Sequence, residues 1–252
     1  MEIREAARCA VCGGTGWKAI EVEGQRSVGR CDCYQRAKLD HLLSRAGIPP
    51  RYEACSFENF NPLTERLHAA KTVAMKFAEE FPLVEFGLLI MGGCGVGKTH
   101  LAVSVLRELI CTREADGLFY DFRDLLKKIQ NSYNSVSQAS EMQILEPVLE
   151  CQVLVLDDLG AERPTEWVRD TIAYIINSRY NRKLTTLITT NYDDRAREVR
   201  ILADGTRLPA EETLEDRIGA RLRSRLYEMC KVISIEGADD FRVRVKQAQY
   251  RF

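Results

Sequence analysis

Short, almost continuously apolar runs alternate with amphipathic stretches over most of the chain. The apolar runs occupy residues 86–91, 117–122, 152–157, 184–190 and 231–235. Runs of this length and composition are typical of strands that are covered on both faces of a parallel sheet. The stretches between them have apolar positions at helical spacing, at residues 98–111, from residue 123, at 166–182 and at 211–229. This alternation predicts an α/β fold, a parallel sheet with flanking helices.

The N-terminal part of the chain does not follow this alternation. Residues 1–33 are rich in Gly and Cys, and residues 34–46 predict a helix that is ended by Gly47 and the prolines after it. We therefore expect two parts, a small module with its helix at residues 1–47 and a larger α/β domain at residues 48–252.

Composition narrows the class of protein. The chain has 252 residues, of which 45% are hydrophobic and 29% charged, and this argues against disorder. Residues 1–5 lead into no apolar stretch, and no apolar run approaches the roughly 18 residues of a membrane span. We expect a cytoplasmic protein with no membrane partner. Thiols stay reduced in that compartment, so the nine cysteines do not predict a disulfide framework.

One glycine-rich segment has the spacing of a phosphate-binding loop, or P-loop. Residues 92–99 read GGCGVGKT, which satisfies G-x-x-x-x-G-K-[ST], and they lie between a predicted strand and a predicted helix. Glycines let the backbone turn N–H groups toward phosphates, the lysine neutralises phosphate oxygens, and the threonine hydroxyl binds magnesium. The alternative is a glycine turn with a chance lysine. The candidate ATP-binding residues are Gly92, Gly93, Cys94, Gly95, Val96, Gly97, Lys98, Thr99 and His100.

Polar residues follow two later strands. Asp157 would hold magnesium beside Thr99, and Asp158 lies where a carboxylate would activate the attacking water. The C-terminal ends of parallel strands meet at one edge of the sheet, so Asn191, or Thr190 as second choice, can reach the γ-phosphate or that water. The alternatives are solvated aspartates at a strand end and an ordinary turn after the later strand.

Three arginines near the C-terminus have helical spacing. Arg217, Arg221 and Arg225 are four residues apart within the predicted helix at 211–229, which would place them on one face. A solvated surface paired with neighbouring glutamates is one interpretation. The other is an arginine offered to the γ-phosphate of ATP on a neighbouring subunit.

Four of the cysteines are clustered. Cys9 and Cys12 form one pair, Cys31 and Cys33 form another, and 18 residues separate the pairs. Four thiolates suit tetrahedral zinc, which would fold a segment too small for its own core. Unliganded or redox-active thiols are the alternative, since the second pair is C-x-C rather than C-x-x-C.

Several motifs together resemble a known family. They are Gly47-Ile48-Pro49-Pro50-Arg51-Tyr52, Phe57-Glu58-Asn59-Phe60, Asp157-Asp158-Leu159-Gly160, Thr189-Thr190-Asn191 and Ser224-Arg225-Leu226-Tyr227-Glu228-Met229-Cys230. In this order around the P-loop, over about residues 47–242, they resemble the DnaC-type replicative helicase loaders and the related IstB-type transposition ATPases, both AAA+ proteins.

The resemblance assigns roles to further residues. It places Tyr52 and Phe57 at the adenine pocket, and Arg242 at the position called sensor two. It makes Arg225 the arginine finger that acts on the next subunit, with Arg221 as a second contact of that kind.

The resemblance also implies a reduced lid and slow hydrolysis. The chain ends 17 residues after Ile235, too few for the usual helical lid. Asp158 is one methylene shorter than the glutamate that most AAA+ proteins carry there. The implied protein is an ATPase that assembles into a ring or spiral and hydrolyses ATP mainly when assembled.

The implied function is to deliver a hexameric, DnaB-type replicative helicase onto single-stranded DNA. The alternative is an IstB-type ATPase that assists a transposase in target DNA selection; a cysteine module favours the loader. A small-molecule kinase would need a lid insertion, and a GTPase would need an N-K-x-D motif that Asn191-Tyr192-Asp193-Asp194 lacks.

Two surfaces are candidates for these partners. The helix after the cysteines has an apolar stripe of Leu39, Leu42 and Leu43, which would dock the helicase or pack on the larger domain. Lys127 and Lys128, with Tyr133 further along, would bind single-stranded DNA or form a solvated helix face.

Overall fold

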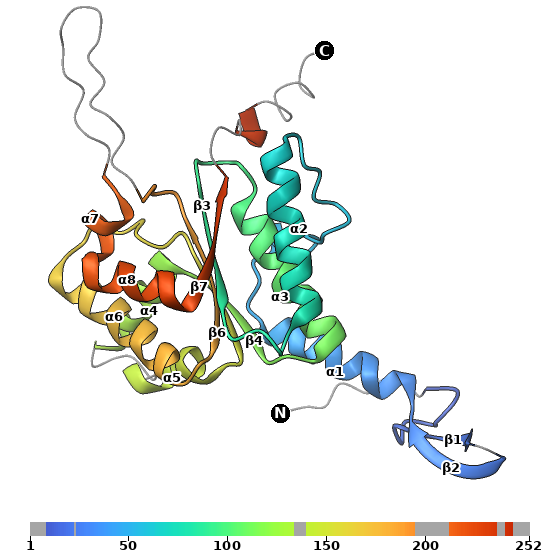
Figure 1. Ribbon diagram of the computed structural model, residues 1–252. Helices are drawn as coiled ribbons and strands as arrows, with labels where there is room; N and C mark the ends of the chain where they lie inside the picture. The colour runs from blue at the N-terminus through green and yellow to red at the C-terminus, as the bar shows by residue number, and fades with distance from the viewer. Residues whose placement is uncertain (1–8, 23, 134–139, 195–211, 236–239, 244–252) are drawn as a thin grey trace, which may run out of the picture.

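A parallel sheet forms the centre of the larger domain (Figure 1). The computed structural model describes residues 9–22, 24–133, 140–194, 212–235 and 240–243. The sheet strands are β3 (Gly87–Gly92), β4 (Gly117–Asp121), β5 (Val153–Asp157), β6 (Thr185–Thr190) and β7 (Cys230–Ile235). They are all parallel, in the order β4-β5-β6-β3-β7. The predicted α/β fold with a parallel sheet is confirmed.

Helices cover both faces of this sheet. They are α2 (Glu65–Glu80), α3 (Lys98–Arg113), α4 (Phe122–Ser132), α5 (Glu141–Glu150), α6 (Glu166–Asn181), α7 (Leu214–Ile218) and α8 (Ala220–Met229), and α1 (Asp32–Arg45) precedes them. Side chains of a strand alternate between faces, so Leu88 and Ile90 of β3 pack with α2 and α3, whereas Leu89 and Met91 pack with α4, α5, α6 and α8. Two apolar cores result, one on each side of the sheet.

The structure contains elements that the apolar pattern did not predict. Helix α2 begins where the Thr64 hydroxyl accepts a hydrogen bond from the Leu67 amide (3.3 Å). Helix α5 begins at a reciprocal pair of bonds between Ser140 and Gln143. The cysteine-rich segment includes a hairpin of β1 (Trp17–Val22) and β2 (Gln25–Arg30).

The single helix predicted for residues 211–229 is wrong. The chain forms two helices, α7 and α8, because Gly219 between them has φ 84° and ψ 150°, which no helical residue adopts. The break rotates Arg217 away from Arg221 and Arg225. The prediction that these three arginines share one helix face is therefore also wrong.

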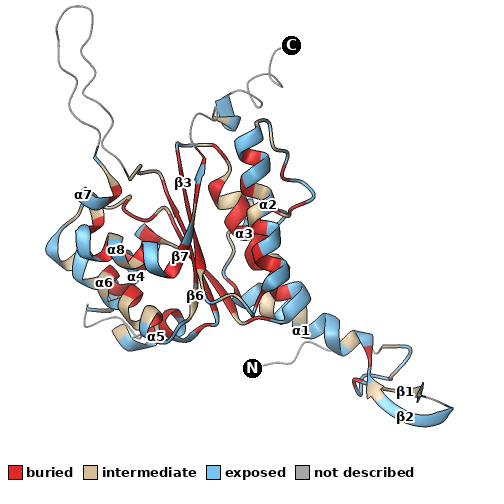
Figure 2. Ribbon diagram, in the orientation of Figure 1, coloured by how far each residue is buried: buried red, intermediate tan, exposed pale blue. Residues whose placement is uncertain are grey.

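Helix α1 extends away from the larger domain and carries the hairpin (Figure 2). It contains no buried residue. Leu42 and Leu43, near its C-terminal end, pack against the core beside α2 and α3, and Lys38 pairs with Glu114. Two of the three leucines of the predicted stripe thus contact the larger domain of their own chain. No described helix is long and apolar enough to cross a membrane.

Candidate nucleotide site

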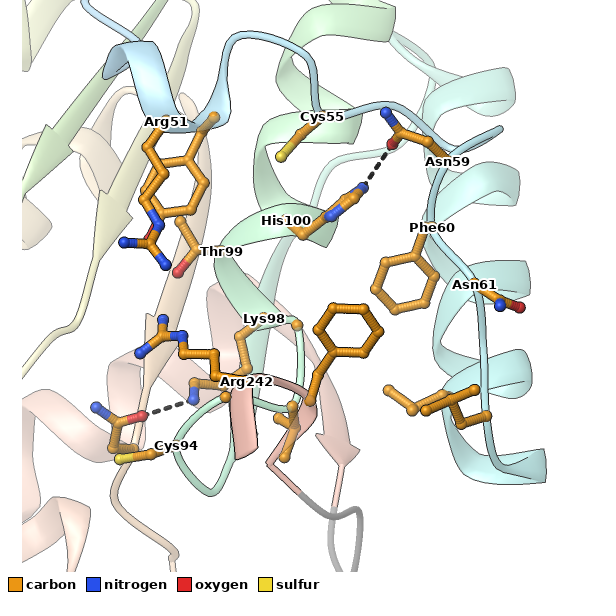
Figure 3. Close-up of a pocket in the computed structure, with 18 of the residues that line it drawn as sticks. Arg51, Cys55, Asn59, Phe60, Asn61, Cys94, Lys98, Thr99, His100 and Arg242 are labelled. Atoms are coloured by element: carbon orange, nitrogen blue, oxygen red, sulfur yellow. Dashed lines mark hydrogen bonds between the residues drawn. The ribbon is translucent and has the colours of Figure 1, made fainter. Parts of the chain in front are cut away.

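A cavity of about 510 Å³ lies at the C-terminal edge of the sheet (Figure 3). Its walls come from the P-loop after β3, the segment 51–64 before α2, the residues that follow β5 and β6, and Phe241 and Arg242. Strand β3 lies between β6 and β7. The chain runs from β3 to β4 toward one edge of the sheet and from β6 to β7 toward the other, so connections leave the adjacent strands β3 and β6 in opposite directions. In α/β sheets ligands bind outside the strand ends at such a point.

The P-loop takes the backbone conformation that its glycines permit. Gly95 and Gly97 have φ values of 73° and 99°, in the left-handed region. A Cβ at Gly97 would lie 2.9 Å from the Phe60 ring, so any side chain there would collide as well. Helix α3 starts at the next residue, and its N-terminal N–H groups form a site for an anion.

Lys98 connects the P-loop to the sheet edge. Its side chain is buried, and Nζ donates to the Gly93 carbonyl (2.7 Å) and to Asn191 Oδ1 (2.6 Å) (Figure 3). Burial lowers the pKa of Lys98, and the charge of Asp158 opposes that shift. Asn191 Nδ2 in turn donates to Asp158 Oδ1 (3.1 Å). Three residues predicted for the site, far apart in the sequence, thus form one hydrogen-bonded chain.

Asp157 and Thr99 lie side by side as magnesium binding requires. The Thr99 hydroxyl donates to Asp157 Oδ1 (2.9 Å), and the Thr189 hydroxyl donates to the same oxygen (2.6 Å). Burial raises the pKa of Asp157 to about 6. A hydroxyl and carboxylate oxygens are the ligands that Mg²⁺ prefers, and the Asp121 carboxylate lies in the same cluster.

The sequence patterns predicted no role for Thr189 or Asp121. Each is a polar side chain at or near the C-terminal end of a strand of the parallel sheet, β6 or β4, and that position was the available signal. Thr189 also accepts a hydrogen bond from the Asp158 amide (2.9 Å), and Asp158 has a left-handed φ of 56°. The second choice for the polar group after β6, Thr190, is buried and donates to the Leu159 carbonyl (2.8 Å), so Asn191 holds that position.

The wall opposite the P-loop comes from the segment before α2. Tyr52, which the resemblance assigns to the adenine pocket, lines the cavity. Phe57 does not: only 7% of its surface is exposed, and it packs in the core. Phe60 is the aromatic residue of that motif that reaches the wall. His100 Nε2 lies 2.9 Å from Asn59 Oδ1, which fastens the segment to α3 (Figure 3).

The predicted arginines lie in two different places. Arg242 lines the cavity, beside Phe241, whose amide donates to the Gly95 carbonyl (3.1 Å). Arg221 is exposed and Arg225 half-buried on α8, and neither lines the cavity. Arg225 donates to Asn177 and lies over the ring of Tyr180 (5.0 Å to the centroid). Arg225 therefore does not belong to the cavity of its own chain.

The four clustered cysteines converge as a metal site requires. The sulfurs of Cys9, Cys12, Cys31 and Cys33 all lie within 4.8 Å of one another. Cys9 and Cys31 sulfurs are 3.8 Å apart, which matches the roughly 3.8 Å between thiolates that each lie about 2.3 Å from a tetrahedral zinc. The Cys12 and Cys33 sulfurs are 3.3 Å apart, and hydrogen bonding between them lowers the pKa of Cys12 to about 6 and raises that of Cys33 to about 12.

Comparison with known proteins gives a consistent result. The family model of the IstB-like ATP binding proteins matches residues 35–248. The replicative helicase loader DnaC of Escherichia coli K12 is 29% identical over 154 residues, which cover 61% of this chain and 62% of that protein. The match thus spans less than two thirds of that relative.

In two solved structures, the part that is similar to this chain covers nearly the whole length of the solved chain. A crystal structure of the DnaC helicase loader has 35% identity and a TM-score of 0.62, with 74% of this chain and 99% of that chain covered. A crystal structure of DnaI has 25% identity and a TM-score of 0.59, with 79% and 99% covered. The chain therefore belongs to the IstB-like ATP binding proteins, and within them to the DnaC-type AAA+ proteins.

Proposed function

We propose that this chain is an ATP-hydrolysing helicase loader, which delivers a DnaB-type hexameric helicase onto single-stranded DNA. The observation that carries the proposal is the likeness to a DnaC helicase loader over 99% of that chain. The resemblance to IstB-type ATPases alone would give the role of a transposase helper. The clustered cysteines at the N-terminal end of α1 support a helicase loader instead.

The site geometry supports a division of labour among its residues. Lys98 would neutralise the β- and γ-phosphates, and Thr99 and Asp157 would hold magnesium, which supplies charge neutralisation to the transferred phosphoryl group. Asp158, held by Asn191, would orient and deprotonate the attacking water. Tyr52 and Phe60 would contact the base, with Arg242 near the phosphates.

Hydrolysis within one subunit would be slow. Asp158 is short for its task, and Arg225 contacts its own α6 rather than the cavity. A neighbouring subunit in a ring or spiral would supply the missing arginine, in a head-to-tail contact. The rate of ATP turnover would then rise when the chains assemble on the helicase or on DNA.

The DNA-binding surface would include the exposed face of α4. Lys127 and Lys128 are exposed, and Lys128 lies over the ring of Tyr120 (5.2 Å to the centroid). Tyr133 is 55% exposed, although its hydroxyl donates to Glu141. Exposed lysines near an aromatic ring suit phosphate contact and base stacking.

Helicase transfer is the test of this function. The chain, ATP and a DnaB-type helicase are mixed with single-stranded DNA circles, and helicase retained on the circles is measured. We expect ATP-dependent retention that falls as salt rises, since phosphate contacts release counterions. A Lys127→Ala/Lys128→Ala double variant should need lower salt for the same retention. Failure to bind the helicase, together with co-purification with a transposase, would contradict the loader function.

The cysteine cluster gives a second prediction. We expect one zinc per chain, bound by Cys9, Cys12, Cys31 and Cys33. A Cys12→Ser/Cys33→Ser variant should lose the zinc, and its hairpin should become protease-sensitive, because zinc binding free energy is folding free energy for so small a segment. A Cys94→Ser/Cys111→Ser variant, which changes two exposed cysteines outside the cluster, is the matched control. If elemental analysis of freshly reduced protein found no zinc, the prediction of one zinc per chain would be refuted.

A further inference from the structure

A short loop after β5 is held by arginines from two helices. This post-strand loop, residues 158–162, begins at the left-handed Asp158 and closes with a bond from the Ala161 amide to the Asp158 carbonyl (3.1 Å). Its last three carbonyls, of residues 160–162, all accept hydrogen bonds from guanidinium groups, which belong to Arg217 of α7 and Arg123 of α4. A strained backbone conformation persists only where the surrounding structure fixes it. We therefore expect these hydrogen bonds to help hold Asp158 in its left-handed conformation.

Arg217 binds two of these three carbonyls. Its Nε donates to the Gly160 carbonyl (2.8 Å), and its second terminal nitrogen donates to the Glu162 carbonyl (2.7 Å). The remaining terminal nitrogen donates to Glu212 (2.7 Å), and only 10% of the side chain is exposed. A planar guanidinium with donors in a fixed fork can satisfy two carbonyls at once, whereas a lysine cannot.

Tyr192 and Gly160 complete the arrangement. The Arg217 guanidinium lies 4.9 Å from the centroid of the Tyr192 ring, and Tyr192 directly follows Asn191. A Cβ at Gly160 would meet both Tyr192 and the Cβ of Arg217 at 3.2 Å, and the φ of Gly160 is 85°. Arg217 therefore packs against the two segments that carry Asp158 and Asn191.

We propose that Arg217 is a positioning residue for ATP hydrolysis, which holds the post-strand loop so that the Asp158 carboxylate stays against Asn191. The inference rests on the proposed ATPase function. It assigns a task to the helix break: Gly219 turns Arg217 toward the loop while α8 directs Arg221 and Arg225 elsewhere. Two residues separate Arg217 from the start of α8. The face of α8 that would be offered to a neighbouring subunit is thereby connected, through Arg217, to the loop that carries Asp158.

Kinetics of Arg217→Ala and Arg217→Lys test the proposal. We expect kcat for ATP to fall about 10²-fold for alanine, the scale of a 1 Å misplacement, with KM and ATP affinity unchanged. Lysine should restore little of the rate. Arg169→Ala is the matched control, because Arg169 donates to the Asp216 carbonyl beside Arg217 (2.9 Å) but does not touch the post-strand loop. Its kcat should equal that of the unaltered chain.

A double-mutant cycle separates positioning from general stability. If Arg217 acts through Asp158, Arg217→Ala should lower kcat less than about twofold in an Asp158→Asn chain, since the two residues then belong to one unit. Full additivity would overturn the proposal. An Arg217→Ala chain with unaltered kcat, beside a slow Asp158→Asn chain, would overturn it as well.

Amide exchange supplies a measure that does not depend on hydrolysis. The Leu159 and Ala161 amides donate to the Thr189 and Asp158 carbonyls, so they should be protected in the nucleotide-free chain. Arg217→Ala, and not Arg169→Ala, should raise their exchange rates, whereas amides of α3 keep theirs. Unaltered exchange would refute the positioning role. If the unaltered chain hydrolysed no ATP while this exchange pattern held, the ATPase function would fail and the loop contact would stand.

Discussion

Lys98→Ala is expected to abolish ATP binding at micromolar nucleotide. The Lys98 ammonium is buried at the sheet edge and is held by Gly93 and Asn191, so it already lies where phosphates would replace those acceptors. Hydrogen bonds to charged groups are worth about 1.5–3 kcal/mol each, so losing those to both the β- and γ-phosphates should weaken affinity by 10²-fold or more, roughly. Fluorescent-nucleotide titration or calorimetry measures the change.

The matched control for this variant is Lys76→Ala. Lys76 lies on the exposed face of α2 and pairs with Glu80, one turn away (3.6 Å). Its removal should leave ATP affinity unaltered. If Lys98→Ala bound ATP as tightly as the unaltered chain, the phosphates would have to lie elsewhere, and the assignment of the cavity would fail.

Arg225→Ala is expected to lower assembly-stimulated hydrolysis by about 10³-fold or more, the worth of an arginine finger in phosphoryl transfer. ATP affinity should stay nearly constant, because Arg225 does not line its own cavity. Arg182→Ala is the control: Arg182 follows α6 and pairs with Glu150 at the surface (3.4 Å). The measurement is ATP turnover at saturating helicase and single-stranded DNA.

A mixing experiment shows whether the arginine acts on the next subunit. Arg225→Ala and Lys98→Ala chains, each inactive alone, should partly restore turnover when combined, because some interfaces then pair an intact lysine with an intact arginine. Mixtures are first shown to co-assemble. If such a mixture recovered no turnover, Arg225 would act only within its own subunit. Its contacts with Asn177 and Tyr180 of the same chain would then be its whole role.

The sheet and the phosphate site could be predicted because each leaves a local pattern. Strands buried on both faces are continuous apolar runs, and the P-loop glycines are required by backbone conformation at those positions. Asn191 could be placed at the phosphate edge because the C-terminal ends of parallel strands meet at one edge of a sheet, and in the structure it contacts Lys98 there. Topology, not side-chain detail, carried that inference.

The remainder depends on packing that the sequence does not display locally. Phe57 and Phe60 are equally aromatic, and only the fold decides that the first enters the core and the second the cavity wall. Gly219 interrupts a stretch whose arginines keep helical spacing on both sides, so spacing alone favoured one helix. Thr189 resembles any β-branched strand residue until its partner Asp157 is known.

The extended helix α1 sets the reach of the module at its end. Fourteen residues at 1.5 Å per residue give a rod of about 20 Å, which is fastened from its middle to its C-terminal end through the pair of Lys38 with Glu114 and through Leu42 and Leu43. A partner bound at the hairpin is thus held near the nucleotide domain of the same chain. Its effective concentration there is set by the length of α1 and not by the concentration of the partner in solution. Lengthening the rod by whole helical turns, which preserves its phase, would tune that concentration.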